Sequence, residues 1–270
     1  MANIHPTAVV EGGAEISESA SVGAYAVIDS GVRVGAGAVI EPHARLCSGA
    51  VIGENCRICG FCTIAGLPQD LHFDPSVQSF AVIGARTVVR EGSTVHRATA
   101  SGGATRIGED CYIMANAHIG HDVSIGSRVI YAPFAAAGGF AEVGDDTFVS
   151  GGVMIHQKVR VGRGVMMSGN SAVSKDVPPY VNAFGRNGMA GFNLVGLVRR
   201  KTPRESIRNL KELYSFVYSS GSPRKRALEA AAAGMAHTPE GEAFLDFFVS
   251  APEGRHFLCP PKKPAKEDGM

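Results

Sequence analysis

Branched aliphatic residues recur at every sixth position from the start of the chain. The first run comprises Ile4, Val10, Ile16, Val22, Ile28, Val34, Ile40, Leu46, Ile52, Ile58 and Ile64. A small residue often lies two positions before them, as Ala8 does before Val10, and glycine often follows, as at Gly23. A helix repeats about every 3.6 residues and a simple strand about every 2, so the pattern indicates neither.

A period of six predicts a parallel β-helix, in which each hexapeptide forms one short face of a prism and a turn. The aliphatic residue points into the prism and the small residue packs beside it. Glycine takes the corner, where a positive φ or a close backbone approach is needed. Three hexapeptides complete one coil of about 18 residues, and the predicted fold class is mainly β.

Two excursions interrupt the repeat, at 66–80 and at 98–106. The pattern resumes at Ile83, one residue out of phase, and then continues in step to Val173. Loops that leave a regular scaffold are common places for binding groups. For Asp70 in the first excursion, a solvated surface loop remains the simpler interpretation of the residue alone.

The composition changes after the repeat, which predicts a β-helix over 1–186, a helical domain over 187–258 and a disordered tail over 259–270. Thr202 with Pro203 predicts a helix start with Thr202 as N-cap. Ser222 and Thr238, each followed by proline, predict two further starts. Basic residues gather here: Arg199, Arg200, Lys201, Arg204, Arg208, Lys211, Arg224, Lys225 and Arg226. They form either an ordinary solvated face or a dock for an acidic partner or a nucleotide phosphate.

Charge and composition narrow the class of protein. The 270-residue chain has a formal net charge of +1, which gives no argument for nucleic-acid binding. It has 34 glycines and no tryptophan, which suits a thin prism with many turns. The start has no basic and apolar leader pattern, and no run of about 18 apolar residues predicts an integral membrane segment. We therefore expect a cytoplasmic protein.

Three cysteines, Cys56, Cys59 and Cys62, have a spacing that can ligate metal. The hexapeptide register argues against this, because Cys56 and Cys62 fall at inward positions on successive faces and Cys59 at a corner. Three such sulfurs would not converge on one ion, so we predict a structural role and no metal.

The strongest candidate for chemistry is the segment 116–122, which contains His118, His121 and Asp122. A neutral imidazole is well suited to accept a proton near pH 7, and an adjacent carboxylate can orient the ring. Two histidines at this spacing are a weak signal by themselves. Coils of a β-helix are spaced about 4.8 Å apart, so His121 should stack on Gly139 and then on Gln157.

With this stacking, His121 and the pair His156–Gln157 lie two coils apart, on the order of 10 Å. That distance suits groups at two ends of one substrate and is too long for ligands of one metal ion. A surface role is the default for any single histidine, but several on one edge favour a site.

These segments together resemble the UDP-N-acetylglucosamine O-acyltransferases that begin lipid A synthesis, a family of left-handed hexapeptide β-helices. The matching stretches are 69–71, 96–97, 116–122, 156–157, 176–180, and Asn193 with 196–200, in order over about residues 4–250. The left hand is implied by the resemblance. The resemblance also implies a homotrimer with active sites between neighbouring prisms, and a bacterial origin.

The resemblance implies that His121 is the general base, with Asp122 as its neighbour and the Gly139 N–H as oxyanion donor. The acceptor would be the sugar 3-hydroxyl of UDP-N-acetylglucosamine. The donor would be a 3-hydroxyacyl group on the phosphopantetheine of acyl carrier protein, with no other cofactor. Substrate contacts would come from Gln69, Asp70, His72, His96, His118, His156, Gln157, Asn193, Arg199 and Arg200. Gly169 would limit acyl length, with Met166 nearby to narrow the space.

Two positions depart from the family pattern: His72 stands in place of a lysine and Phe140 in place of a histidine. A histidine is mostly neutral at pH 7, so a phosphate contact there would be weaker or pH-dependent. These departures leave open whether the acceptor carries a hydroxyl or an amine at its 3-position, and which acyl chain is preferred.

Two other functions remain open at this point. A zinc-dependent carbonic anhydrase of the same fold would use histidine ligands across an interface, and His96, His118 and His121 are conceivable ligands. It would leave the first excursion and the C-terminal helices unexplained. A non-catalytic scaffold is the other, and the His121–Asp122 pair argues against it.

Overall fold

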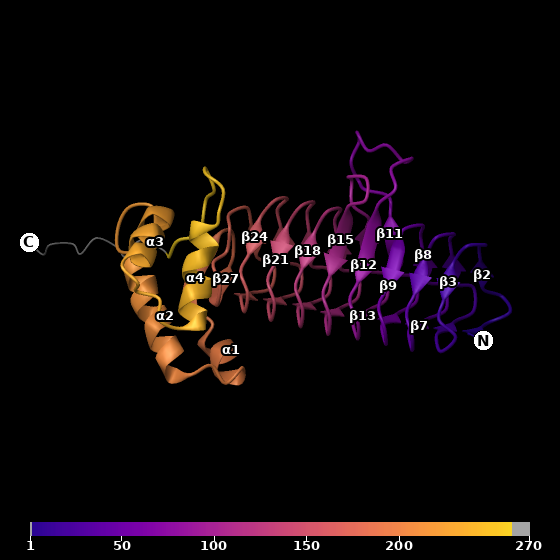
Figure 1. Cartoon of the computed structure of the whole chain (residues 1–270), viewed down its shortest axis with the longest axis horizontal. Coiled ribbons are helices and arrows are strands. Elements are labelled where there is room, and N and C mark those ends of the chain that lie inside the picture. Colours follow the sequence, from indigo (N-terminus) through magenta and orange to yellow (C-terminus); the bar gives the residue numbers. More distant parts are fainter. Residues whose placement is uncertain (1, 261–270) are drawn as a thin grey trace, which may run out of the picture.

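The computed structural model describes residues 2–260, and the tail predicted to be disordered lies, from residue 261 on, outside the described residues. The chain winds into a long left-handed β-helical prism that ends in a group of helices (Figure 1). Its three faces are sheets of 11, 9 and 8 strands, all paired in parallel except the last two strands of the 11-stranded sheet. We call them the first, second and third sheets.

Each strand is short and pairs with the strand one coil away. The first sheet contains β1 (Asn3–Ile4), β4 (Ser21–Val22), β7 (Val39–Ile40), β10 (Arg57–Ile58), β13 (Val88–Val89), β16 (Tyr112–Ile113), β19 (Ile130–Tyr131), β22 (Phe148–Val149), β25 (Met166–Met167), β27 (Val181–Phe184) and β28 (Gly188–Phe192). The second contains β2 (Val9–Val10), β5 (Val27–Ile28), β8 (Arg45–Leu46), β11 (Thr63–Gly66), β14 (Thr94–His96), β17 (His118–Ile119), β20 (Ala136–Ala137), β23 (Met154–Ile155) and β26 (Ala172–Val173). The third contains β3 (Glu15–Ile16), β6 (Arg33–Val34), β9 (Ala50–Ile52), β12 (Phe80–Ile83), β15 (Ala104–Ile107), β18 (Ser124–Ile125), β21 (Glu142–Val143) and β24 (Arg160–Val161).

The six-residue repeat forms the core, as predicted. Ile28, Ile58 and Ile119 are fully buried inside the prism. Stacking follows the coil, because Ile119 pairs with Ala137 and Ala137 with Ile155. Ile4 is 40% exposed because it lies in the first coil, at the N-terminal end of the prism.

One coil replaces two aliphatic residues with a large and a small one. Tyr131 is fully buried at the inward position of the first sheet, and Ala137 takes the next inward position. The small alanine leaves volume that the tyrosine ring can fill. The Tyr131 hydroxyl is buried without a hydrogen-bond partner among the described residues, and burial raises its pKa.

Because a buried hydroxyl without a partner costs free energy, we expect Tyr131→Phe to stabilise the protein by about 1 kcal/mol. The two proteins should be unfolded by heat at equal concentration, and the variant should have the higher midpoint. A clearly lower midpoint would mean that the hydroxyl has a hydrogen-bonding partner in solution.

The corners explain why glycine follows the aliphatic residue. Gly23 does not have a positive φ, but a Cβ there would lie 2.6 Å from the backbone nitrogen of Pro42. Close approach is therefore the reason for glycine at this position. The positive φ falls two residues further on, where many residue types occur, including Tyr25, Phe61 and Asp122.

The motif residue Asn116 has a structural place of this kind. It adopts a positive φ of 58°, and its amide oxygen lies 2.4 Å from where a Cβ on Gly92 would be. Asn116 thus packs over a glycine of the previous coil. The same arrangement joins Asn55 to Gly37 and Asn170 to Gly152.

The two excursions are loops that leave the prism and contact one another (Figure 1). The Gly102 N–H donates to the Gln78 carbonyl at 2.8 Å, and the Arg97 guanidinium donates to the Pro75 carbonyl at 3.0 Å. The second loop is shorter than the predicted 98–106, because residues 104–106 already belong to β15. They pair there with β12 and β18.

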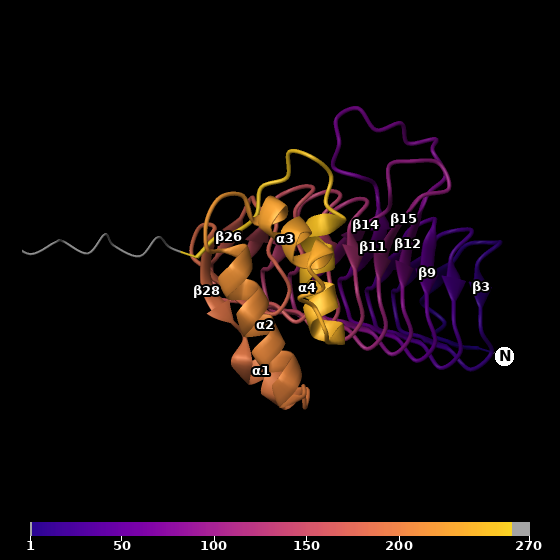
Figure 2. The same cartoon turned by 60° about the vertical axis from the view of Figure 1, so that its left-hand side comes forward.

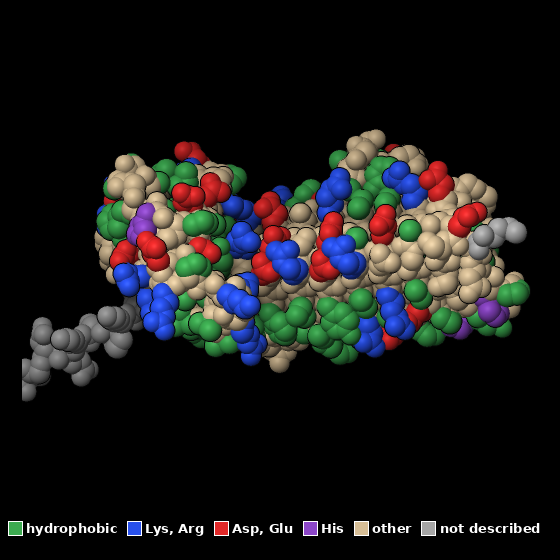
Figure 3. Space-filling model, turned by 60° about the horizontal axis from the view of Figure 1, so that its bottom comes forward, with side chains coloured by type: hydrophobic (Ala, Val, Ile, Leu, Met, Phe, Trp, Pro, Cys, Tyr) green, Lys and Arg blue, Asp and Glu red, His purple; other side chains and the backbone are tan. Residues whose placement is uncertain are grey.

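Acidic and basic side chains alternate along the corner between the third and first sheets. Arg86 pairs with Asp110, and Arg128 with Asp146. Figure 3 shows such alternating charges along one face of the prism. The arginines are about half exposed, so each pair contributes little to stability.

The C-terminal part begins with a β-hairpin. β27 and β28 pair antiparallel and extend the first sheet, so helices begin later than the predicted boundary at 187. They are α1 (Leu194–Arg199), α2 (Arg204–Val217), α3 (Pro223–Ala232) and α4 (Pro239–Val249) (Figure 2). Thr238 caps α4, as predicted, with its hydroxyl accepting from the Gly241 N–H.

One predicted cap is wrong. Pro203, and not Thr202, is the N-cap residue of α2, and no side chain caps that helix end. The helices share a core of their own around Phe244 and Phe248. In the part of the chain that the structure describes, no helix has the length and apolar character needed to cross a membrane.

Candidate active site

His121 and Asp122 lie at the corner between the second and third sheets, which we call the catalytic corner. Asp122, Phe140 and Lys158 follow one another along it, one per coil, as shown by the backbone bonds from Phe140 N to His121 O and from Lys158 N to Gly139 O. His121 Nδ1 lies 2.9 Å from Asp122 Oδ2, and both side chains are mostly buried. With Asp122 ionised, Nδ1 is the donor, so Nε2 is left as the basic nitrogen.

Gly139 lies directly against the imidazole, as the predicted stacking requires. A Cβ on Gly139 would be 2.4 Å from His121 Cε1 and 2.6 Å from Nε2. Among the described residues, the Gly139 N–H donates to no acceptor. A basic nitrogen and a free N–H donor therefore lie side by side.

The orienting carboxylate is itself held by residues that the sequence did not indicate. Asp122 accepts from the Thr99 hydroxyl at 2.8 Å and from the Thr99 N–H at 3.0 Å. The Asp122 N–H donates to the Thr105 hydroxyl at 2.8 Å. Thr99 comes from the second loop, so that loop fixes the direction of the base.

Two further histidines lie beside the pair. The rings of His96 and His118 meet edge to face with centroids 5.0 Å apart, and His118 Nδ1 bonds to the Thr94 hydroxyl at 2.8 Å. Burial, followed by the neighbouring histidines His118 and His121, lowers the pKa of His96 to about 4. Burial and then His121 also lower the pKa of His118. Both rings are therefore neutral at pH 7 and can accept or donate one hydrogen bond each.

The lowered pKa of His96 predicts a pH-dependent stability. The unfolded chain binds this proton near pH 6.5 and the folded chain near pH 4. Acid therefore favours the unfolded state, and stability is lost as pH falls from about 6.5 to about 4. The loss is on the order of 3 kcal/mol. We expect thermal midpoints of His96→Gln to fall less steeply than those of the natural protein over this range. Parallel curves would contradict the assignment.

His156 and Gln157 lie further along the same edge. Gln157 packs against the catalytic corner, because a Cβ on Gly138 would lie 2.8 Å from its backbone nitrogen. His156 is exposed and borders a mostly apolar hollow with Met154, Ala172 and Val173. The structure thus brings His96, His118, His121, Asp122, Gly139, His156 and Gln157 to one edge.

Gln69, Asp70 and His72 lie apart from this edge, in the projecting first loop. All three are exposed, and Asp70 accepts from the His72 N–H at 2.9 Å in a local turn. The loop is joined to the site through Arg97, whose guanidinium is buried under it and lies 5.5 Å from the Phe73 ring.

The predicted nucleotide residues of α1 lie at a different corner of the same chain. Asn193 caps α1 through the Gly196 N–H at 2.9 Å and donates to the Gly164 carbonyl at 3.1 Å. Arg200 is half-buried over Gly164, and burial lowers its pKa. Arg199 is exposed. A single chain therefore does not bring these side chains to His121.

The predicted acyl-length residues are also elsewhere in the single chain. Met166 lies on the first sheet, paired with Phe148 and Asn182. Gly169 lies at the corner between the first and second sheets. A Cβ added to Gly169 would lie 3.5 Å from the Gly151 carbonyl oxygen, which would be its nearest neighbour.

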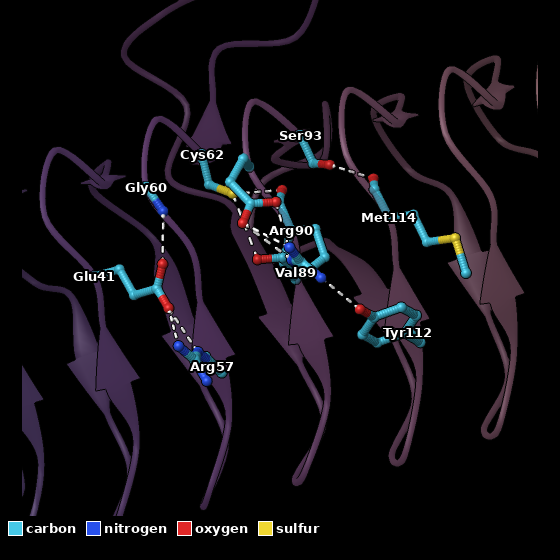
Figure 4. Close-up of polar contacts among 10 residues, drawn as sticks. Glu41, Arg57, Gly60, Cys62, Val89, Arg90, Ser93, Tyr112 and Met114 are labelled. Atoms are coloured by element: carbon cyan, nitrogen blue, oxygen red, sulfur yellow. Dashed lines mark hydrogen bonds and ion pairs between the residues drawn. The ribbon is translucent and has the colours of Figure 1, made fainter.

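One group of possible metal ligands is present among residues 2–260, and it does not include the histidines. Atoms of Glu41, Cys59 and Glu91 lie within 4.8 Å of one another. Arg57 and Arg90 already pair with the two carboxylates (Figure 4). Burial raises the pKa of Cys59 to about 11, so its thiol keeps its proton at neutral pH. These residues suit an ion-pair cluster better than a metal site.

The sulfur atoms of Cys56 and Cys62 have separate partners and do not point to one shared ion. The Cys56 thiol donates to the Gly84 carbonyl at 3.0 Å, and the Cys62 thiol to the Arg90 carbonyl at 3.0 Å. Among the described residues, His96, His118 and His121 do not form a group of possible metal ligands within one chain. Nδ1 of His118 is bonded to Thr94 and Nδ1 of His121 to Asp122, which leaves Nε2 of each ring without those partners.

Comparison with known proteins identifies the family. Residues 31–66 and 104–135 match bacterial transferase hexapeptide repeats, and residues 176–256 match the second domain of UDP-N-acetylglucosamine O-acyltransferases. The acyl-[acyl-carrier-protein]–UDP-N-acetylglucosamine O-acyltransferase of Paraburkholderia phymatum is 41% identical over 94% of this chain and 99% of its own. This chain belongs to that family of acyltransferases.

Solved structures of the family share the whole fold. The UDP-N-acetylglucosamine acyltransferase of Francisella novicida is 32% identical, with a TM-score of 0.87 over 96% of this chain and 95% of its own. The enzyme of Campylobacter jejuni is also 32% identical, with a TM-score of 0.85 over 94% and 99%. The predicted resemblance and fold class are both confirmed.

Proposed function

We propose that this enzyme transfers a 3-hydroxyacyl group from acyl carrier protein to the sugar 3-hydroxyl of UDP-N-acetylglucosamine, the first step of lipid A synthesis. The observation that carries the proposal is the His121–Asp122 pair beside the free N–H of Gly139. A base and a donor this close suit attack of a hydroxyl on a thioester.

In this reaction, His121 Nε2 removes the proton of the sugar hydroxyl as its oxygen attacks the thioester carbon. The tetrahedral oxyanion receives a hydrogen bond from the Gly139 N–H. Asp122, held by Thr99, stabilises the imidazolium. The C–S bond then breaks and the thiolate of the phosphopantetheine takes the proton back from His121. No metal or further cofactor is required by these steps.

A homotrimer completes the proposed site. Asp70, Asn193, Arg199 and Arg200 lie away from His121 in one chain, so a neighbouring prism would have to bring them to the base. The exposed apolar residues Phe134, Met154 and Phe184 fit an association of prisms. Gly169 and Met166 would limit acyl length from the neighbouring chain, by the same argument.

The basic helices are the proposed dock for acyl carrier protein, which is acidic. Arg204, Arg208 and Lys211 are exposed on α2, and Lys225 on α3. Complementary charge speeds association more than it tightens it. A cytoplasmic location is part of the same proposal.

The test is mass spectrometry of the product formed by purified protein. UDP-N-acetylglucosamine is supplied with 3-hydroxyacyl carrier proteins of increasing chain length, and in parallel with its 3-amino analogue. One O-acylated product from a preferred chain length is expected. Product only from the amino sugar would move the acceptor to an amine, and no product from either would reject the proposed function.

A further inference from the structure

The hydrogen bonds that hold Asp122 continue beyond Thr99 to a buried serine. Ser79 ends the first loop, directly before β12, and is 2% exposed. Its hydroxyl donates to the Ala98 carbonyl at 2.5 Å. That carbonyl and the Thr99 N–H belong to one peptide group, and the N–H donates to Asp122 Oδ2 at 3.0 Å. A single peptide therefore joins Ser79 to the carboxylate that orients the base.

The complete chain of hydrogen bonds runs from Ser79 to the imidazole. The serine hydroxyl donates to the peptide, the peptide N–H donates to Asp122, and Asp122 lies 2.9 Å from Nδ1 of His121. Ser79 is buried, and the side chains of Asp122 and His121 are mostly buried. Hydrogen bonds in such surroundings polarise one another, so a bond to the carbonyl of this peptide strengthens its N–H as a donor.

The segment 78–80 also fixes the position of the second loop. The Ala98 N–H donates to the Phe80 carbonyl at 3.2 Å, and the Gly102 N–H donates to the Gln78 carbonyl at 2.8 Å. Ser79 lies between these two residues and supplies the side-chain contact. Because a peptide group is planar, a hydroxyl that sets the direction of the Ala98 carbonyl also sets the direction of the Thr99 N–H.

We propose that Ser79 is a positioning residue for the base. Through the peptide between residues 98 and 99, it orients Asp122 and strengthens the stabilisation of the His121 imidazolium. The inference rests on the proposed function, in which that imidazolium forms as the sugar hydroxyl loses its proton. No proton moves along the chain, since the peptide keeps its hydrogen. Ser79 acts by orientation and polarisation, without contact with substrate.

A purely structural role for Ser79 makes a different prediction. A hydroxyl that only satisfied the buried Ala98 carbonyl would support the stability of the loops and leave the base unaffected. Both roles predict a lower thermal midpoint for Ser79→Ala, because the carbonyl loses its partner. The positioning role predicts in addition a loss of kcat that depends on Asp122.

Steady-state kinetics with saturating substrates give the first readout. Ser79→Ala should lower kcat about fivefold, which corresponds to one ordinary hydrogen bond, with both KM values unchanged. Ser79→Thr keeps the hydroxyl and should recover most of this loss. The matched control is Thr147→Val. Thr147 is 1% exposed, and its hydroxyl donates to the Gly162 carbonyl at 3.0 Å at another corner. This control should lose stability and keep the natural kcat.

A double-mutant cycle with Asp122→Ala separates the two roles of Ser79. Asp122→Ala removes the group on which the chain acts, so adding Ser79→Ala should lower its residual kcat no further. Equal fold losses in the two backgrounds would overturn the inference, because they would mean that Ser79 acts independently of the carboxylate. An unchanged kcat in Ser79→Ala alone would overturn it as well.

A spectroscopic readout needs no substrate. The Nδ1 proton of His121 should give a downfield resonance in protein with isotope-labelled histidine, assigned by its loss in His121→Ala. The resonance should move upfield in Ser79→Ala, because the bond to Asp122 weakens, and should stay in place in Thr147→Val. An unchanged resonance in Ser79→Ala would overturn the inference. Absence of acylated product from the natural protein would instead reject the proposed function, and the resonance would still decide whether Ser79 acts on His121.

Discussion

His121→Ala is expected to lower kcat about 10³-fold, within the range that a positioned general base contributes. The imidazole is the group whose Nε2 is left basic by the bond from Nδ1 to Asp122. The KM for either substrate should change little, because the proton is removed only as the transition state forms. Turnover is measured with saturating substrates, and size-exclusion chromatography checks that the assembly is unchanged.

The matched control is His43→Ala. His43 is stacked between Tyr25 and Phe61 in the N-terminal part of the prism, far along the chain from the proposed chemistry. This variant should keep the natural kcat. If His121→Ala retained near-normal turnover, His121 would not be the general base, whatever its contacts.

The sequence predicted the site best where the repeat determines position. Six-residue spacing places His121 over Gly139, and the structure has the two in contact. Because neighbouring coils keep the same register, the residue that stacks on another can be predicted by counting along the sequence. The same counting placed Cys56 and Cys62 inside the prism, where they are buried.

Contacts made by irregular segments could not be predicted by counting residues along the repeat. Thr99 is 23 residues before Asp122 and reaches it only because the second loop folds back on the corner. Arg199 and Arg200 are adjacent in sequence, yet one is exposed and the other half-buried over Gly164. Arg199 is the last residue of α1 and Arg200 is its C-cap, so the difference depends on where this helix ends. The sequence of α1 gives little sign of a helix, because it contains a glycine and two valines, which are weak helix formers.

The corners separate the two reasons expected for glycine there, a positive φ and a close backbone approach. Close approach explains Gly23, whereas the positive φ is not reserved for glycine. In the structure, Tyr25, Phe61 and Phe140 all adopt a positive φ near 60°. Each such residue costs on the order of 1 kcal/mol, which the many ladder bonds of neighbouring coils offset. The corner can therefore carry functional side chains.

At Gly139 an added side chain would meet the proposed base directly, and Gly139→Ala is expected to lower kcat 10²-fold or more. Its φ is not positive, so alanine is compatible with the backbone. The added methyl, however, would lie 2.4 Å from His121 Cε1, and the ring must move to relieve the contact. Displacing a base by about 1 Å is enough for a loss of this size.

The experiment compares kcat, KM and thermal midpoint for Gly139→Ala and Gly12→Ala. Gly12 is also a corner glycine, but a Cβ there would meet nothing within 4 Å, so its variant should behave like the natural protein. A folded Gly139→Ala variant with at least half of the natural kcat would show that the base tolerates displacement. The absence of a side chain at Gly139 would then serve coil packing alone. A selective loss of kcat at an unchanged midpoint would instead tie this glycine to the position of the imidazole.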